Sequence, residues 1–470
     1  LDLDAQSLTV GSAGSLGSTG NADLDFLGAA SVNGTLNTGG VSTLNADSIS
    51  VAGTATVNAA DITLTSANAL TVAQGSTWAV SGDLGLVGDA ISIDTDLSVS
   101  GDLALGSVSS SSISVGATNT SAVVSVAGTA TLQTGALTLA GAMSVTGVTT
   151  ANVSGLATLA ATSAVTSNGG LNLTAADMAL SGSIAQRGQV TLATTGAMTI
   201  NAGATLSTTS AADITLNAGG ALVNRALVSA AGDLSVGNGA TGSTVTNTGT
   251  LQAAGDVTLN IDGLVYNQAA LDTADTDVQD GRNLGLAYDG SSSASTATFE
   301  NRLTVDLDQI GAIYANGGDL TIASGTLVNE GELEASGTID LSNTALRNQL
   351  AGIFDGAAHA GDARADLMSA RSQYDYSSSN GITSVATDEY LLGGRADFIA
   401  SIRSHSLTLG ASALNLGGRV NAGSISGTLT EENLDSTRLQ STTSEEVAPP
   451  NIDSAVSAGV SVVADGGTNT

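Results

Sequence analysis

Four aspartates lie close together in the stretch DTADTDVQDG, and their carboxylates could ligate a metal ion. They are Asp272, Asp275, Asp277 and Asp280. Oxygen-rich turns that end in Gly suit Ca²⁺. The order departs from that of an EF-hand loop, because Asp280 comes one residue late, and the nonapeptide calcium repeat Gly-Gly-x-Gly-x-Asp is absent. The stretch therefore favours a polar excursion loop, with calcium as the alternative and no other cofactor expected.

Pairs of aspartates at i and i+2 could serve general acid–base catalysis, because residues with this spacing share one face of a strand. The pairs are Asp2 and Asp4, Asp23 and Asp25, and Asp306 and Asp308. Leucines occupy alternate positions, so we predict that these acids face water. The chain has no Lys or Cys, and we expect its two histidines, His359 and His405, on exposed loops. These observations predict that the protein is not an enzyme, and a polysaccharide-cleaving β-helix is disfavoured.

Tyrosines and arginines are concentrated in one late segment of the chain. The residues that could contact a partner are Arg364, Arg371, Tyr374, Tyr376 and Tyr390. Tyr and Arg are favoured at recognition surfaces, and insertions in repeat proteins often lie on the binding face. The alternative is that these side chains cover a hydrophobic flank of the repeats.

The elements that must position these residues are short repeats. Gly-Asp phrases recur as GDLGL from Gly82, GDLAL from Gly101, GDLSV from Gly232, GDVTL from Gly255 and GDLTI from Gly318. The spacing is 19 residues from Asp83 to Asp102 and 23 from Asp233 to Asp256. A period of about 20 residues is typical of a repeat in which each unit is one structural layer.

Each repeat alternates apolar and polar residues, as in LVNEGELEASGTIDLS from Leu327 to Ser342. This period of two predicts half-buried strands. We expect Leu333 and Ile339 to face the interior and Glu330, Glu332 and Glu334 to face water, with Gly, Asn and Ser in turns that tolerate positive φ. The period favours parallel stacking of coils, about 4.8 Å apart, over an antiparallel sandwich. The predicted fold is an all-β parallel β-solenoid.

The repeat is more regular in some segments of the chain than in others. Residues 1–264 are the most regular, 265–406 contain insertions, 407–430 return to coils, and 431–470 read as an acidic, Pro-containing linker with an extra strand from Ala455. In the second insertion, Ala363, Leu367, Ala370 and Tyr374 would share one helical face. We therefore predict a short helix at about 362–374.

Composition excludes several classes of partner. The chain has 43 acidic and 11 basic residues, a net charge of −32, and 42% hydrophobic residues. Such a surface repels nucleic acids and anionic lipids, and no apolar run approaches the roughly 18 residues of a membrane span. The absence of Cys excludes disulfides and thiolate metal sites. LDLDAQSLTV at the start is already strand-like, so we expect the chain to be a processed or excised piece of something longer.

The repeat phrases resemble those of filamentous haemagglutinin-like exoproteins, the adhesins of two-partner secretion. The likeness is carried by VTNTGTLQAAGDVTLN from Val245, LVNEGELEASGTIDLS from Leu327 and DITLNAGGALVNRALVSAAGDLSV from Asp213, and it covers 213–345 best. It implies a right-handed parallel β-helix, export through an outer-membrane transporter, and display at the surface of a Gram-negative bacterium or release from it. The family's Asn-Pro-Asn secretion motifs are missing, since no Pro precedes Pro449.

Two functions follow as hypotheses. The first is a structural shaft of a secreted adhesin or biofilm-matrix fibre, which presents insertions to a cell-surface receptor or matrix polysaccharide. The alternative is a self-assembling sheath or surface-layer subunit whose acidic faces bind divalent cations. Polymerisation that depends on concentration or calcium would distinguish the two.

Overall fold

The computed structural model describes the backbone of residues 1–271, 277–288, 294–304, 307–348, 368–377, 381–391, 400–410, 415–416, 419–427 and 461–464, and the side chains of 1–268, 310–348, 400–410 and 420–427. The fold is an all-β parallel β-solenoid of about 15 turns, as the repeat predicts. The chain forms two compact units. Unit 1 comprises Leu1–Val245, Thr250–Gly263 and Ala315–Gly318, and unit 2 comprises Thr246–Gly249, Leu264–Tyr314 and Asp319–Thr470.

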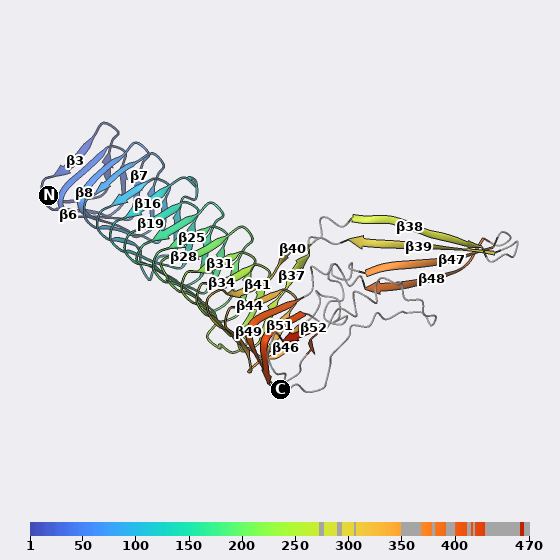
Figure 1. Cartoon of the computed structure of the whole chain (residues 1–470). Helices are drawn as coiled ribbons and strands as arrows, with labels where there is room; N and C mark the ends of the chain where they lie inside the picture. Colours follow the sequence, from blue (N-terminus) through green and yellow to red (C-terminus); the bar gives the residue numbers. More distant parts are fainter. Residues whose placement is uncertain are drawn as a thin grey trace. The chain divides into compact units, whose positions relative to one another are not determined.

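In unit 1 each coil contributes one strand to each of three parallel stacks, here named a, b and c (Figure 1). Stack a contains β3 (Ser15–Ser18), the first part of β6 (Thr35–Ala46) and of β8 (Thr56–Ser66), β10 (Thr77–Val80), β13 (Leu97–Val99), β16 (Val123–Val126), β19 (Ala142–Val145), β22 (Ala164–Ser167), β25 (Ser183–Gln186), β28 (Thr205–Thr208), β31 (Leu227–Ala230) and β34 (Thr250–Ala253).

Stack b follows stack a in each coil. It contains β1 (Asp2–Ala5), β4 (Ala22–Phe26), the second part of β6 and of β8, β11 (Leu84–Val87), β14 (Leu103–Gly106), β17 (Ala130–Thr134), β20 (Thr149–Val153), β23 (Leu171–Ala175), β26 (Val190–Thr194), β29 (Ile214–Ala218), β32 (Leu234–Val236) and β35 (Val257–Asn260). Stack c completes each coil. It contains β2 (Leu8–Val10), β5 (Ala29–Val32), β7 (Ser48–Val51), β9 (Ala69–Val72), β12 (Ala90–Ile93), β15 (Ser112–Val115), β18 (Ala136–Leu139), β21 (Leu156–Leu159), β24 (Asp177–Leu180), β27 (Met198–Ile200) and β30 (Ala221–Asn224).

The alternation in the sequence produces this core directly. In stack b, Ile62 lies beside Leu84, and Leu84 beside Leu103, and all three side chains are buried. Like residues therefore stack on like residues from coil to coil. A fully buried side chain of this size contributes about 1.5–3 kcal/mol, and repetition supplies the stability that aromatic residues would supply elsewhere.

The Gly-Asp phrase joins successive coils by a side-chain hydrogen bond. The Asp61 carboxylate accepts a bond of 2.8 Å from the backbone N–H of Asp83, and the Asp213 carboxylate accepts one of 2.8 Å from Asp233. Gly82 and Gly232, which precede the two donating N–H groups, do not have positive φ. The sequence predicts that the turn glycines are needed for positive φ. Gly82 is needed for a different reason, because a Cβ at this position would collide with the Asp61 carboxylate.

Unit 2 continues the three-stack pattern in the strands that the structure describes. Its stack c contains β33 (Thr244–Asn247), which begins in unit 1, β36 (Leu264–Asn267), β43 (Thr326–Asn329), β46 (Ala345–Asn348) and β50 (Asn415–Leu416). Its other stacks contain β41 (Ala312–Ala315), β42 (Leu320–Ala323), β44 (Glu332–Ala335), β45 (Thr338–Leu341), β49 (Ser401–Leu409), β51 (Arg419–Gly427) and β52 (Ser461–Ala464). Antiparallel strands are β37 (Ala269–Leu271) with β40 (Leu307–Ile310), and β38 (Asp277–Tyr288), β39 (Ala294–Thr304), β47 (Met368–Ser377) and β48 (Gly381–Leu391).

A buried row of asparagine side chains runs along stack c of unit 2. The Nδ2 of Asn247 donates to Asn267 Oδ1 at 2.8 Å, Asn267 to Asn329 at 2.7 Å, and Asn329 to Asn348 at 2.7 Å. All four residues are 0% exposed. The Asn of the Asn-x-Gly motif, expected in a turn, is therefore an interior residue whose amide serves as both donor and acceptor.

One secondary-structure prediction is wrong in the part of its segment that the structure describes. Residues 361–367 lie outside that part, and Met368–Ser377 form strand β47 where the sequence predicts the end of a helix at 362–374. Strand pairing on both sides, with β39 and β48, outweighs the weak helical spacing of small residues. The linker predicted at 431–470 is described only at β52.

Candidate functional site

Two insertions interrupt the coils of unit 2 at the same point of the repeat. Asn267 and Asn348 are the register partners of Asn329. In the coil of Asn329 the chain passes directly through Glu330 and Gly331 into β44. In the two other coils, residues 269–310 and 350–399 are inserted just before the position of Gly331.

Backbone hydrogen bonds establish this equivalence. The Glu332 N–H donates to the Gly311 carbonyl at 2.9 Å, and the Ser401 N–H donates to the Gly331 carbonyl at 2.9 Å. Gly311, Gly331 and Ala400 therefore occupy equivalent corners of successive coils. At the first insertion, the Gly311 N–H also donates to the Gln268 carbonyl at 3.0 Å, so the two ends of the insertion meet.

The two insertions join in one antiparallel sheet in the order β38-β39-β47-β48. The first insertion supplies β38 and β39, and the second supplies β47 and β48 (Figure 1). Ala297 of β39 pairs with Tyr374 of β47, although 77 positions separate them in the sequence. We name this four-stranded sheet the insertion sheet. The sequence predicts insertions here, but nothing in it indicates that they pair with one another.

Most of the predicted recognition residues lie on the insertion sheet. Arg371, Tyr374 and Tyr376 are in β47, and Tyr390 is in the neighbouring β48. In the backbone register of the sheet, Arg371 lies opposite Glu300 of β39, and Tyr390 lies opposite Ser369 of β47. Arg364 lies outside the described residues. The structure thus brings four of the five residues onto two adjacent strands.

The predicted calcium residues are described in part. Asp272 and Asp275 lie outside the described residues, and Asp277 and Asp280 are positions of β38. Calcium binding there stays a prediction. Among the residues that the structure does describe, no group of three His, Cys, Asp or Glu side chains is arranged to hold a metal ion.

The paired acids at the start of the chain are exposed, as the alternation predicts. Asp2 and Asp4 of β1 lie in register with Asp23 and Asp25 of β4. Asp25 accepts a hydrogen bond of 2.7 Å from Asn45. The other predicted positions fall elsewhere: His405 is an exposed residue of β49, while the side chains of Asp306, Asp308 and His359 lie outside the described part.

Two tyrosine–glutamate pairs flank the insertions. Tyr266, just before the first insertion, donates a hydrogen bond from its hydroxyl to Glu330 Oε1 at 2.8 Å. Tyr314, just after it, donates to Glu332. Neither pair was among the predicted site residues. The signal was present, since both tyrosines lie within five residues of an insertion end in a chain with six tyrosines.

Glu330 corrects the expectation that all three glutamates of the repeat are solvated. It is 2% exposed, while Glu332 is exposed. Glu330 follows the last residue of β43 and lies at the corner, where the two-residue alternation of the strand no longer applies. Its backbone N–H donates to the Asn267 carbonyl at 2.8 Å, which holds the corner against the coil that carries the first insertion.

The surroundings of Tyr314 keep its hydroxyl protonated. Burial raises the pKa of Tyr314, and the hydrogen bond to the Glu332 carboxylate and the charges of Glu332 and Glu334 raise it further. Tyr314 is therefore a neutral hydrogen-bond donor at any physiological pH. The ion pair between Arg403 and Glu334, at 3.8 Å with side chains 67% and 47% exposed, contributes little by itself.

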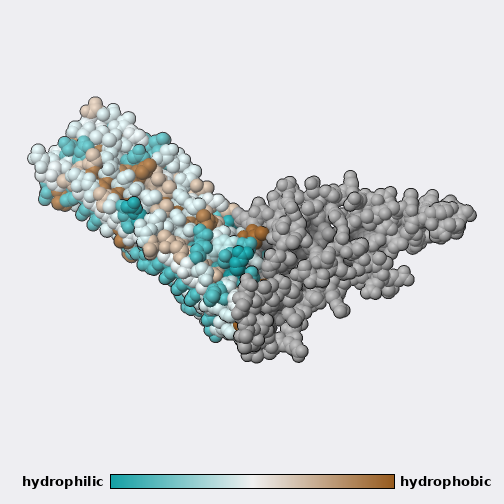
Figure 2. Space-filling view, in the orientation of Figure 1, coloured by the Kyte–Doolittle hydropathy of each residue, from teal (hydrophilic) through white to brown (hydrophobic). Residues whose placement is uncertain are grey.

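The outer face of unit 1 is polar and made of small residues. In the view of Figure 2 it is mostly pale, with separate brown and teal areas. The large apolar side chains that are exposed lie far apart in the sequence, for example Leu27, Val108 and Leu156. Among the described residues, no helix is long and apolar enough to span a membrane.

Comparisons with protein-family models, with curated proteins and with solved structures found no match.

Proposed function

We propose that this chain is a structural shaft segment of a secreted bacterial fibrous adhesin or biofilm-matrix protein. The coils serve as a rigid support, and the insertion sheet makes contact with a cell-surface receptor or a matrix polysaccharide. The proposed role is not enzymatic. Export through an outer-membrane transporter and display at a Gram-negative surface complete the proposal, and both depend on the resemblance of the repeat phrases.

One observation carries the proposal: both insertions enter the solenoid at the same corner and then pair with each other. An insertion at that corner leaves the strands on both sides in register, as shown by Leu333 beside Ile402. The coil is therefore complete without the insertions. The insertions are therefore not needed to support the solenoid. Their Tyr and Arg residues favour a role in binding.

The structure defines a clean deletion experiment. Removing 269–310 joins Gln268 to Gly311, two residues already in hydrogen-bond contact. Removing 350–399 leaves Gln349 between Asn348 and Ala400, in the place that Glu330 fills in the uninterrupted coil. The first resulting sequence, Asn-Gln-Gly-Ala-Ile, restores the Asn-x-Gly motif. The second, Asn-Gln-Ala-Ser-Ile, keeps Ala400 at the Gly position, as in the native chain.

The double deletion should fold with the same far-ultraviolet β signal and the same emission of Trp78 as the native chain. The fluorescently labelled native chain should adhere to Gram-negative biofilm matrix or to epithelial cell monolayers, and the double deletion should not. Equal adhesion of both chains would contradict the proposal. Calcium-dependent polymerisation of a native chain that adheres to neither surface would favour the sheath-forming alternative.

A further inference from the structure

A half-open hollow of about 310 Å³ lies on unit 1, at the corner between stacks a and b. It extends over four successive coils and is lined by Ser144, Val145, Thr146, Thr166, Ser167, Asn168, Ala185, Gln186, Arg187 and Thr209. Its size is at the lower end of the range of small-molecule sites, about 300–1,000 Å³.

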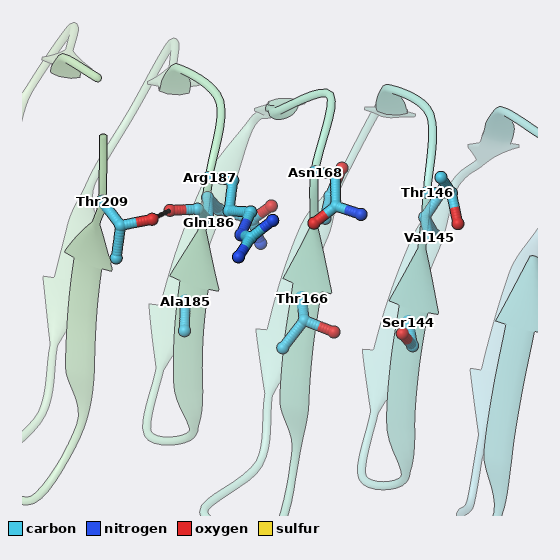
Figure 3. A pocket seen from close by; sticks show the side chains of 10 residues that line it. Ser144, Val145, Thr146, Thr166, Asn168, Ala185, Gln186, Arg187 and Thr209 are labelled. Atoms are coloured by element: carbon cyan, nitrogen blue, oxygen red, sulfur yellow. Dashed lines mark hydrogen bonds between the residues drawn. The ribbon is translucent and has the colours of Figure 1, made fainter. Parts of the chain in front are cut away.

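The hollow has two rows of side chains (Figure 3). Thr146, Asn168, Arg187 and Thr209 follow one another at the ends of the stack a strands. Ser144, Thr166 and Ala185 form the second row on the strands themselves, in register with one another. Successive residues of a row belong to successive coils, which lie roughly 4.8 Å apart. The hollow therefore presents hydroxyl and amide groups in a periodic line along the stacking direction.

Arg187 is the charged residue of this lining, and it is preceded by a long stretch of the chain without charged residues. Residues 103–176 contain no Asp, Glu, Lys, Arg or His. Within the described part of the chain, no carboxylate pairs with the Arg187 guanidinium, which is exposed. Asp213, which follows Thr209 in sequence by four residues, accepts a hydrogen bond from the Asp233 N–H of the next coil. The guanidinium is thus available to an anionic ligand.

The walls of the hollow are fixed by hydrogen bonds. Gln186 is 2% exposed, and its Nε2 donates to the Val165 carbonyl at 2.9 Å. Thr209 Oγ1 donates to the Gln186 carbonyl at 3.4 Å (Figure 3). The Oε1 of Gln186 has no hydrogen-bond partner, which is uncommon for a buried polar atom. Gln186, which directly precedes Arg187, is therefore hydrogen-bonded to both neighbouring coils.

Backbone strain occurs at the edge of the same hollow. Ser210 and Ala211, directly after Thr209, both have φ of 59°, and they are the non-glycine residues with positive φ among the described part of the chain. L-residues rarely adopt this conformation. Strained turns of this kind are concentrated at functional sites.

We propose that this hollow binds a carboxylate-bearing sugar, a hexuronate residue of an acidic polysaccharide. Arg187 receives the carboxylate through paired N–H donors, and Ser144, Thr166 and Asn168 exchange hydrogen bonds with the ring hydroxyls. The lining offers no aromatic ring for a nucleobase. This site belongs to unit 1, and none of its lining residues comes from the insertion sheet, so it goes beyond the shaft role proposed above.

The test is isothermal titration calorimetry of the native chain, in EDTA, with tetragalacturonate as the probe. Saturable binding is expected, with none for a neutral galactose tetrasaccharide and weaker binding for free galacturonate and for inorganic phosphate. Arg187→Gln should weaken binding at least tenfold. Ala185→Leu should do the same by filling the hollow while keeping the charge.

Arg225→Gln is the matched control. Arg225 is an exposed arginine of unit 1 that does not line the hollow, and its loss should leave the affinity within twofold of the native value. Trp78 emission and the far-ultraviolet signal verify that each variant is folded. No saturable binding by the native chain, equal binding of the neutral tetrasaccharide, or an equal loss in Arg225→Gln would overturn the proposal. If the double insertion deletion still binds tetragalacturonate, the binding site lies on the coils. The site can then be tested independently of the shaft role, even if that role proves wrong.

Discussion

The Asp83 carboxylate accepts a hydrogen bond of 2.8 Å from the backbone N–H of Asp102, one coil further along the solenoid. Asp102 repeats the arrangement with the N–H of Thr129 at 2.7 Å. A Cβ on Gly101 would lie 2.7 Å from the Gly82 carbonyl oxygen and closer still to the Asp83 carboxylate. The Gly and the Asp of the repeated phrase are therefore coupled: each Asp binds the next coil, and each Gly leaves room for the preceding Asp.

Replacing Gly101 by Ala should destabilise unit 1 by about 1–3 kcal/mol, the usual cost of forcing an extra carbon into a packed site. Urea unfolding followed by Trp78 fluorescence measures it, because Val80 of the Trp78 strand pairs with Val99, just before Gly101. Gly20→Ala is the control, since a Cβ there would meet nothing within 4 Å. Equal effects of the two substitutions would show that packing against Asp83 is unimportant.

The stability of unit 1 should depend on pH through Asp102. The backbone N–H and then the side chain of Thr129 donate to this carboxylate and lower its pKa. A carboxyl with a lower pKa in the folded state stabilises the fold above its unfolded pKa of about 3.9, and that stabilisation is lost as the pH falls through the folded value. Asp102→Asn keeps an acceptor oxygen but removes the charge.

Asp102→Asn should therefore be less stable than the native chain at neutral pH, and the difference should shrink once the pH falls below about 4. Urea midpoints from Trp78 fluorescence across this range provide the measurement. A difference that stays constant from neutral to acidic pH would show that the charge of Asp102 has no part in the bond to Thr129.

Much of the coil could be predicted because strand alternation is a local property. Leu333 and Ile339 face the interior, as the period of two indicates, and their burial needs no knowledge of neighbouring coils. The role of Gly101 could not be predicted in the same way, because the atom that excludes its Cβ belongs to Asp83, a residue of another coil.

The candidate site was predictable in its residues but not in its arrangement. The excess of Tyr and Arg singled out Arg371 and Tyr374, yet the helix expected around them is strand from Met368 onward. Their partners, β39 and β48, are supplied by a distant segment and a following one. The two insertions pair because the coils bring their starting points together. A local sequence pattern carries no information about this contact.

Removing the amide of Asn329 should destabilise unit 2. The side chain accepts from Asn267 and donates to Asn348, both at 2.7 Å, and all three residues are fully buried. Asn329→Ala leaves two buried partners incompletely bonded. A cost of about 2–6 kcal/mol is expected, from about 1–3 kcal/mol for each lost partner. Hydrogen–deuterium exchange of peptides that cover 326–348 should rise accordingly.

Asn152→Ala is the matched control for this row of asparagines. Asn152 is exposed on β20 of unit 1, so its substitution should change neither the thermal midpoint nor the exchange of the 326–348 peptides. Exchange in those peptides that is unaffected by Asn329→Ala would mean that backbone pairing alone holds the coils of unit 2.

The two tyrosine–glutamate pairs should differ in strength because one carboxylate is buried and the other is not. Tyr266→Phe removes a donor from Glu330, which is 2% exposed, and should cost about 1–3 kcal/mol. Tyr314→Phe removes a donor from the exposed Glu332, where water takes its place, so a change under about 1 kcal/mol is expected. Thermal unfolding followed by circular dichroism compares the two variants, which lose the same hydroxyl group. A larger loss of stability in Tyr314→Phe than in Tyr266→Phe would contradict this prediction. It would show that the buried hydrogen bond to Glu330 is not the stronger of the two.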